Sequence, residues 1–329
     1  VARRALEVSD RWDGTSDPWP IAEGDPCRVF IGSTPVIDGY IDKRSLSASA
    51  TTRTLGYSGR DRAGDLVDCS AVLSSYTFRD LTLVDFATAL AQPFGIRVSV
   101  QAGLTLARRN KIMVQPGDKV YEAIAREATE AGVLLVSDAA GGIVITRAGT
   151  TRATSLIEGQ NVLSASVEHD AADRFNRYVI ATQIAGTDEA AGDATRITAE
   201  ATDPAVRASR VLMIRPDKGY DVAGARRRAD WEARIRAARA TVATVTVLGW
   251  TQANGEIWPL NALCRVKCPR MIDVDGDALI SQVDHTVSEA GKISLIRLVR
   301  PDAFMPEPTK ATVKTSGAGG WPELINGAS

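Results

Sequence analysis

The stretch Thr241–Phe304 reads TVATVTVLGW TQANGEIWPL NALCRVKCPR MIDVDGDALI SQVDHTVSEA GKISLIRLVR PDAF. Polar and apolar residues alternate over Thr244–Val247, which is the period of a half-buried strand. Further strands are expected at Cys264–Val266, Leu279–Val287 and Ile293–Arg300, separated by turn sequences rich in Asn, Asp and Gly. Four strands joined by short turns predict an antiparallel sheet or a small barrel.

The totals are those of a soluble multidomain protein. The chain has 329 residues, 44% hydrophobic residues and a net charge of -1 from 39 basic and 40 acidic residues. This length predicts two to four domains. The charge balance argues against a dedicated nucleic-acid or membrane-surface binder, and no apolar run reaches the length of a membrane span.

The first part of the chain, residues 1–78, is expected to be an all-β domain. It contains short alternating runs separated by turns such as Gly-Ser-Thr-Pro. Because Ala5–Val8 already reads as a strand, and the chain opens without Met or an apolar signal core, we expect a strand or two of this domain to precede Val1.

The spacing of apolar residues changes at residue 81 from that of strands to that of a helix. Residues 79–150 are expected to form an inserted α/β domain. One helix face is predicted by a set of apolar residues three and four apart: Leu83, Phe86, Ala87 and Leu90. A second helix is predicted with Asp118 as its N-cap and Gly132 as its stop. A hairpin is expected to follow, across Asp-Ala-Ala-Gly-Gly.

The rest of the chain is expected to be mainly β. We expect a second β region at 151–246, with one long helix at 222–240, then a C-terminal β domain at 247–306 and a flexible tail at 307–329. The tail is rich in Gly, Pro, Ser and Thr. The predicted class is therefore mainly β with an α/β insertion, in several domains.

The sequence contains no clear catalytic or metal-binding motif. The two histidines, His169 and His285, lack a nearby nucleophile motif. The run Asp273–Asp277 offers oxygen ligands at alternate positions, but its glycine stands fourth rather than sixth, so a hairpin turn is favoured over a calcium loop. No catalytic, cofactor or metal site is predicted, and the protein is not expected to be an enzyme.

The long helix is rich in arginine. Taken alone, it could bind phosphates, but acidic residues four positions away from several arginines favour a solvated or subunit-facing helix. A basic face turned to a DNA-conducting channel stays open as an alternative. The candidate subunit or channel interface comprises Arg226, Arg227, Trp231, Arg234 and Trp258.

Four cysteines do not make a disulfide framework. Cys264 and Cys268 lie four apart on a predicted strand, about 13 Å at roughly 3.3 Å per residue, too far for a disulfide within the chain. We expect both to be small buried residues. Disulfides between subunits, through Cys27, Cys69, Cys264 or Cys268, stay open.

Three separated stretches, taken together and in this order, resemble the baseplate hub proteins of Mu-like contractile-tailed phages. They are Gly24–Ser70 with its Asp-Leu-Val-Asp-Cys-Ser ending, Arg226–Trp258 with Trp-Glu-Ala-Arg before Thr-Val-Thr-Val, and Leu279–Phe304 with its closing Arg-Pro-Asp-Ala-Phe.

This resemblance implies a structural virion protein of the tail baseplate, similar to the central hub of phage T4. It implies two hub-type antiparallel β-barrels per chain and a homotrimer whose six barrels form a ring. That ring would join the sixfold tail tube to the threefold spike and leave a channel for DNA. The implied partners are the spike, the tail tube and its initiator, the baseplate wedge and the tape-measure protein.

The sequence is also compatible with two other interpretations. The segment from Gln115 looks like the opening of a peptidoglycan-binding LysM module, and Glu168 with Asp170 could be a catalytic carboxylate pair. Either would make the protein a cell-wall-binding or cell-wall-degrading tail component. A secretion-system spike hub shares the architecture, but usually continues into a long spike in the same chain.

Overall fold

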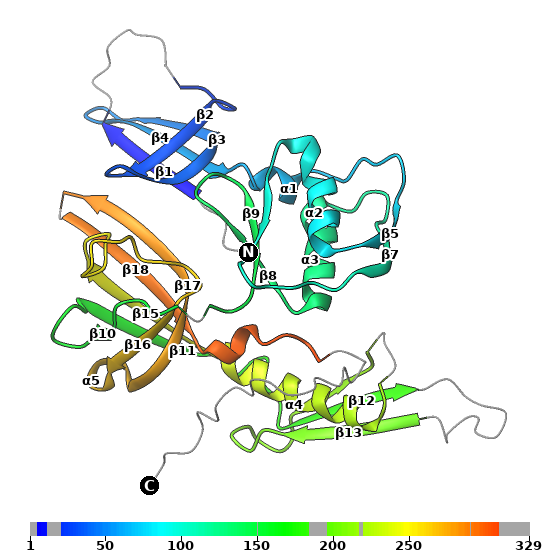
Figure 1. Ribbon diagram of the computed structural model, residues 1–329. Helices are drawn as coiled ribbons and strands as arrows, with labels where there is room; N and C mark the ends of the chain where they lie inside the picture. Colours follow the sequence, from blue (N-terminus) through cyan, green and yellow to red (C-terminus); the bar gives the residue numbers. More distant parts are fainter. Residues whose placement is uncertain are drawn as a thin grey trace. The chain divides into compact units, whose positions relative to one another are not determined.

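The computed structural model describes residues 5–11, 21–149, 151–183, 196–216, 220–289 and 291–308 (Figure 1). The chain divides into two compact units, Val1–Arg174 with Glu232–Glu307 and Phe175–Trp231 with Pro308–Ser329. The predicted class, mainly β with an α/β insertion, is confirmed. None of the helices in the described ranges has the length and apolarity needed to cross a membrane.

The N-terminal sheet has four antiparallel strands in the order β1-β4-β3-β2 (blue in Figure 1). The strands are β1 Ala5–Arg11, β2 Pro26–Ile31, β3 Thr34–Ala48 and β4 Arg53–Asp61. Ile37 and Ile41 are both buried, and because they lie four residues apart on β3 they point to the same face of the sheet. A β-bulge between Ile41 and Lys43 bends β3 where it pairs with β4.

The α/β domain follows directly after β4. Its helices and strands are α1 Gly64–Asp68, β5 Thr77–Leu81, α2 Leu83–Ala91, β6 Val98–Val100, β7 Arg109–Met113, α3 Val120–Ala131, β8 Leu134–Ser137 and β9 Ile143–Thr146. The four residues predicted to share a helix face all lie buried on α2. Ala63 and Leu66 lie in the same hydrophobic core as these residues, so the boundary expected at 78/79 is corrected to the end of β4.

The second predicted helix is present with a different start. Its N-cap is Lys119, while the Asp118 carboxylate accepts hydrogen bonds from the Gln115 backbone N–H and from Arg126. Asp118 therefore closes the turn before the helix instead of capping it. Gly132 ends α3 in the left-handed conformation, with φ of 66°, as predicted.

The C-terminal sheet has six strands in the order β10-β16-β17-β18-β15-β11. They are β10 Leu156–Ile157, β11 Ser164–His169, β15 Thr241–Leu248, β16 Leu263–Cys268, β17 Val274–Ser288 and β18 Gly291–Val299. Strands from both 151–246 and 247–306 thus share one sheet and one core, which corrects the boundary expected between these two regions. Local patterning missed this because β11 pairs with β15 across more than 70 residues.

The turn expected at Asp273–Asp277 begins earlier in the chain. A short helix, α5 Pro269–Ile272, and a left-handed Asp273 make the connection, and β17 starts at Val274. Asp275 and Asp277 are therefore strand residues, and each pairs with an arginine, Asp275 with Arg265 and Asp277 with Arg152. The arrangement does not fit a calcium loop.

The second unit contains the three-stranded sheet β13-β12-β14. Its strands are β12 Arg177–Gln183, β13 Arg196–Thr202 and β14 Val211–Ile214. The long predicted helix is α4 Val222–Arg239. This helix begins in the second unit and ends in the first, because the boundary falls between Trp231 and Glu232.

Asn261 holds the segment by which the chain leaves the α/β domain. Its side-chain carbonyl accepts a hydrogen bond from the Gly149 N–H at 2.9 Å, and its amide donates to the Arg147 carbonyl at 2.7 Å. Its own backbone is left-handed, with φ of 57°, a conformation that Asn tolerates better than Ala does.

We therefore expect Asn261→Ala to destabilise the first unit by about 2 kcal/mol, from two lost hydrogen bonds and backbone strain. Asn261→Gly relieves the strain but not the lost hydrogen bonds, and should fall in between. Hydrogen exchange of the first unit, read by mass spectrometry, measures both, with the exposed Asn110→Ala as control. Equal stability of the Asn261→Ala and Asn110→Ala variants would contradict this role of the side chain.

Candidate functional site

The histidines do not form a catalytic arrangement with the residues around them. His169 Nδ1 lies 3.1 Å from the Thr241 hydroxyl, and His285 Nδ1 lies 2.9 Å from that of Ser294. Ser294 itself donates to the Gly249 carbonyl at 2.7 Å, so its hydroxyl accepts from His285. Within the described part of the chain, no group of three His, Cys, Asp or Glu side chains is placed to hold a metal ion.

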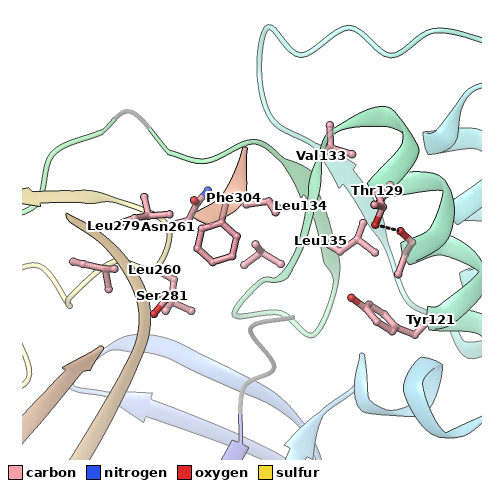
Figure 2. Close-up of a pocket in the computed structure, with 14 residues that line it drawn as sticks. Tyr121, Thr129, Val133, Leu134, Leu135, Leu260, Asn261, Leu279, Ser281 and Phe304 are labelled. Carbon is pink, nitrogen blue, oxygen red and sulfur yellow. Dashed lines mark hydrogen bonds between the residues drawn. The ribbon is translucent and has the colours of Figure 1, made fainter. Parts of the chain in front are cut away.

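A cleft of about 270 Å³ lies where the α/β domain meets β17 and the turn Pro301–Phe304 (Figure 2). Figure 2 shows the ring of Phe304 among Leu134, Leu260 and Asn261. The polar side chains at its wall are engaged elsewhere. Thr129 donates to the Ala125 carbonyl at 2.9 Å and Ser281 to the Arg297 carbonyl at 3.1 Å. Asn261, also at the wall, is hydrogen-bonded to Gly149 and Arg147. Apart from the Tyr121 hydroxyl the remaining lining is apolar, so the cleft is a packing seam and not a polar ligand site.

The candidate interface residues on α4 are spread along the helix. Arg226 and Arg227 are exposed in its first half, where Arg226 pairs with Asp230 at 3.4 Å. The Arg228 guanidinium stacks on the half-buried Trp231, 4.7 Å from the ring centre. Arg234 lies in the second half of the helix, 3.6 Å from Asp302.

Trp258 does not belong to a surface site. Its side chain is 5% exposed and packs in the core of the C-terminal sheet with residues such as Val245 and Ile280. The interface expected from the sequence included Trp258, but this indole lies in the core of the C-terminal sheet. Its assignment to an interface is corrected.

Cys264 and Cys268 are free and buried, as predicted. Burial raises the pKa of the Cys264 thiol to about 11. Compared with a thiol of ordinary pKa, roughly 8.5, this lowers the thiolate fraction at pH 8 by about two hundredfold. Cys69, in contrast, is exposed, and Cys27 is half-buried.

We expect a disulfide reagent such as Ellman's to modify Cys69 quickly in the native protein, and Cys264 and Cys268 only on unfolding. Peptide mass spectrometry after timed quenching identifies the modified thiols. Cys69→Ser should remove the fast phase. Modification of Cys264 as fast as that of Cys69 would contradict the buried placement.

The two large sheets share one plan. β2, β3 and β4 have 6, 15 and 9 residues, and β16, β17 and β18 have the same lengths. The order β1-β4-β3-β2 matches β15-β18-β17-β16, with antiparallel pairing throughout. The long strand of each sheet carries a bulge after an isoleucine, Ile41 in one and Ile280 in the other.

The amino-acid sequence repeats with the plan. Cys-Arg-Val occupies the second to fourth positions of both β2 and β16. Asp38 lies directly across from Arg28, and Asp277 directly across from Arg265. Trp-Pro-Ile precedes the first Cys-Arg-Val and Trp-Pro-Leu the second. This spaced Trp-Pro and Cys-Arg-Val pattern was the signal in the sequence that could have revealed the repeat.

Comparisons with known proteins agree with this architecture. The baseplate hub protein gp44 of Escherichia phage Mu is 31% identical over 274 residues, which cover 80% of this chain and 71% of the relative. The chain belongs to the Mu baseplate hub protein family. Family models match in three places: the N-terminal domain of Mu GpP-like baseplate assembly proteins at 2–61, the gp44-like second domain at 63–147 and the GpP fourth domain at 221–307.

Solved structures of other tail proteins share the fold of this hub protein. The 43 kDa tail protein of prophage MuSo2 from Shewanella oneidensis is 35% identical, with a TM-score of 0.80 over 92% of this chain and 90% of that one. A tail protein from Neisseria meningitidis has a TM-score of 0.76 over 94% and 91% of the two chains at 22% identity, which shows the fold alone.

Membership of the Mu hub family establishes the class of function. The chain is a structural protein of the phage virion, located in the tail baseplate, and is not an enzyme. The segment that resembles a LysM module lies inside the gp44-like second domain, where α3 continues into β8 and the hairpin β8–β9. The exposed Glu168 and Asp170 lie at the end of β11.

Proposed function

We propose that three copies of this chain form the central hub of the baseplate. The repeated sheet plan carries the proposal, because each chain then contributes two similar β domains to the ring. Three chains related by a threefold axis would present six such domains, alternating between the two kinds. Such a ring would have the symmetry to meet a sixfold tail tube on one side and a threefold spike on the other.

The ring would leave a central channel for DNA. The proposed partners are the spike, the tail tube and its initiator, the wedge proteins and the tape-measure protein. DNA is proposed as cargo in transit and not as a specific ligand, since the chain as a whole has a net charge of -1. The two sheets are also proposed to curl into hub-type barrels.

Light scattering over a dilution series tests the assembly. We expect a species near three times 35.1 kDa. Electron-microscopic class averages viewed down its axis should show six peripheral density maxima. A chain that stays monomeric at every concentration, both alone and with its spike protein added, would refute the trimer.

The exposed face of α4 is proposed as a subunit or channel interface. Arg227 is exposed and, within the described part of the chain, forms no ion pair, so reversing its charge breaks no described salt bridge. If α4 contacts another subunit, we expect Arg227→Glu to raise the midpoint concentration of trimer formation by about tenfold, since a like-charge contact at an interface is costly. Lys111→Glu, on the exposed strand β7, is the matched control. Equal midpoints for the two variants would exclude Arg227 from the subunit interface and leave the channel face.

A further inference from the structure

Asp38 and Asp277 occupy the same position in the two repeats. Each lies on the long strand of its sheet, three residues before the isoleucine that precedes the bulge, and opposite the arginine of Cys-Arg-Val. The Arg28 Nε lies 3.0 Å from the Asp38 carboxylate. Arg265 acts on Asp277 through its charge while it pairs with the neighbouring Asp275.

Each aspartate also binds a second arginine, and this one is not part of the repeat. Arg62 Nε lies 2.8 Å from Asp38, and its backbone N–H donates to the Asp38 carbonyl at 3.1 Å. Arg152 binds Asp277 through both of its terminal nitrogens, at 2.7 and 3.2 Å. Arg62 comes directly after β4, whereas Arg152 comes before β10, so the two arginines reach equivalent aspartates from unrelated places in the chain.

What the two arginines share is their position beside the α/β domain. Arg62 lies in the segment by which the chain enters that domain before α1, and Arg152 in the segment by which it leaves after β9. Each of the two covalent connections between the α/β domain and a large sheet therefore carries one arginine to the same point of that sheet.

We propose that Asp38 and Asp277 are a matched pair of positioning residues that anchor the two connections and thereby fix both large sheets relative to the α/β domain. The consequence for assembly rests on the proposed trimeric hub: six evenly spaced domains require the two sheets of each chain to keep one fixed arrangement. Arg28 pairs with Asp38 across the strands and Arg265 acts on Asp277 through its charge, while Arg62 and Arg152 tie the connections to the two aspartates.

The charge states suit this role. Burial alone would raise the pKa of Asp38, but the hydrogen bonds and charges of Arg62 and Arg28 outweigh it and lower the pKa. The hydrogen bond from Arg152 is the main cause of the lowered pKa of Asp277. Both carboxylates are therefore ionised at neutral pH. The loss of one partly exposed ion pair of this kind changes the ratio of chains with the fixed arrangement to chains with a loosened one by about threefold. The loss of these pairs should loosen the arrangement without unfolding the sheets.

Pulsed electron paramagnetic resonance on the full chain tests the anchors directly. Spin labels are attached through unnatural residues at Ser47 and Thr286, which are exposed near the ends of β3 and β17. The native protein should give one narrow distance distribution. The double variant Asp38→Asn, Asp277→Asn should broaden this distribution. We expect the ratio of native to other arrangements to fall about tenfold in the double variant and about threefold in each single variant.

Asp80→Asn is the matched control, because it removes an ion pair with Arg108 that lies within the α/β domain. Its distance distribution should stay as narrow as the native one. Circular dichroism and hydrogen exchange within the sheets should stay native in all variants. A double variant with intact sheets and an unchanged narrow distribution would overturn the proposal.

Trimer formation separates this inference from the proposed function. If the native chain trimerises, the double variant should trimerise less well. Its equilibrium constant for trimer formation should fall by a factor of about ten for each chain that must adopt the native arrangement. A native chain that never trimerises would count against the hub ring. The distance measurement would still decide whether the two aspartates anchor the sheets.

Discussion

Phe86→Ala is expected to destabilise the α/β domain by about 3–5 kcal/mol. Phe86 lies on α2, is fully buried, and packs edge-on against Phe78 of β5, with ring centres 5.1 Å apart. Truncation removes the transfer free energy of the ring and leaves a cavity that two helices and a two-stranded sheet cannot close. The loss is a large fraction of the stability of a typical domain.

Hydrogen exchange read by mass spectrometry is the suitable measurement, because a chain with several domains does not unfold in a single step. Protection should fall in α2, α3 and β8–β9 and persist in β17 and β18. Phe30→Ala is the matched control, since Phe30 is 52% exposed on β2 and its loss should change stability by less than about 0.5 kcal/mol. Similar effects of the two substitutions would mean that Phe86 does not fill the core.

Gly39→Ala is expected to disrupt the N-terminal sheet, at a cost of at least about 3 kcal/mol. A Cβ atom at residue 39 would lie 1.9 Å from the Arg60 carbonyl oxygen and 2.6 Å from the Asp61 Cα. Both are backbone atoms of β4, so no side chain can move to make room. The methyl group and the pairing of β3 with β4 cannot coexist in this geometry.

Gly276→Ala on β17 is the control for this substitution. A Cβ atom there meets nothing within 4 Å, and the backbone is not in the left-handed region. Adding a methyl group at such a position should be neutral or slightly stabilising. Hydrogen exchange of β3 and β4 separates the cases, and unchanged protection in the Gly39→Ala variant would show that the two strands can part locally at little cost.

The elements with a local signature were predictable from the sequence. Leu83, Phe86, Ala87 and Leu90 bury one face of α2 because their spacing places them there, whatever the rest of the chain does. The hairpin β8–β9 and the helix end at the left-handed Gly132 could likewise be predicted from neighbouring residues in the sequence. The extent of the C-terminal sheet was not predictable in this way, since its edge strands β10 and β11 come from far earlier in the chain.

The repeat was missed because most of its equivalent positions differ. Gly39 and Gly59 of the N-terminal sheet correspond to Ala278 and Leu298 of the C-terminal one, so hydrophobicity along the two sheets is not alike. Pairing partners and the shared bulge reveal the equivalence, and they are properties of the folded chain. The assignment of Trp258 to an interface was wrong for a related reason, because its neighbours in the sequence do not distinguish a buried indole from one at an interface.

The joining of both sheets in one polypeptide has a consequence for supply during virion assembly. If the two kinds of sheet were separate gene products, their relative synthesis would have to be balanced, and surplus of either would leave incomplete particles. Covalent linkage through the α/β domain fixes their ratio at one to one in every molecule made. Differences such as Gly39 against Ala278 can therefore accumulate without any need for one sheet to find the other in solution.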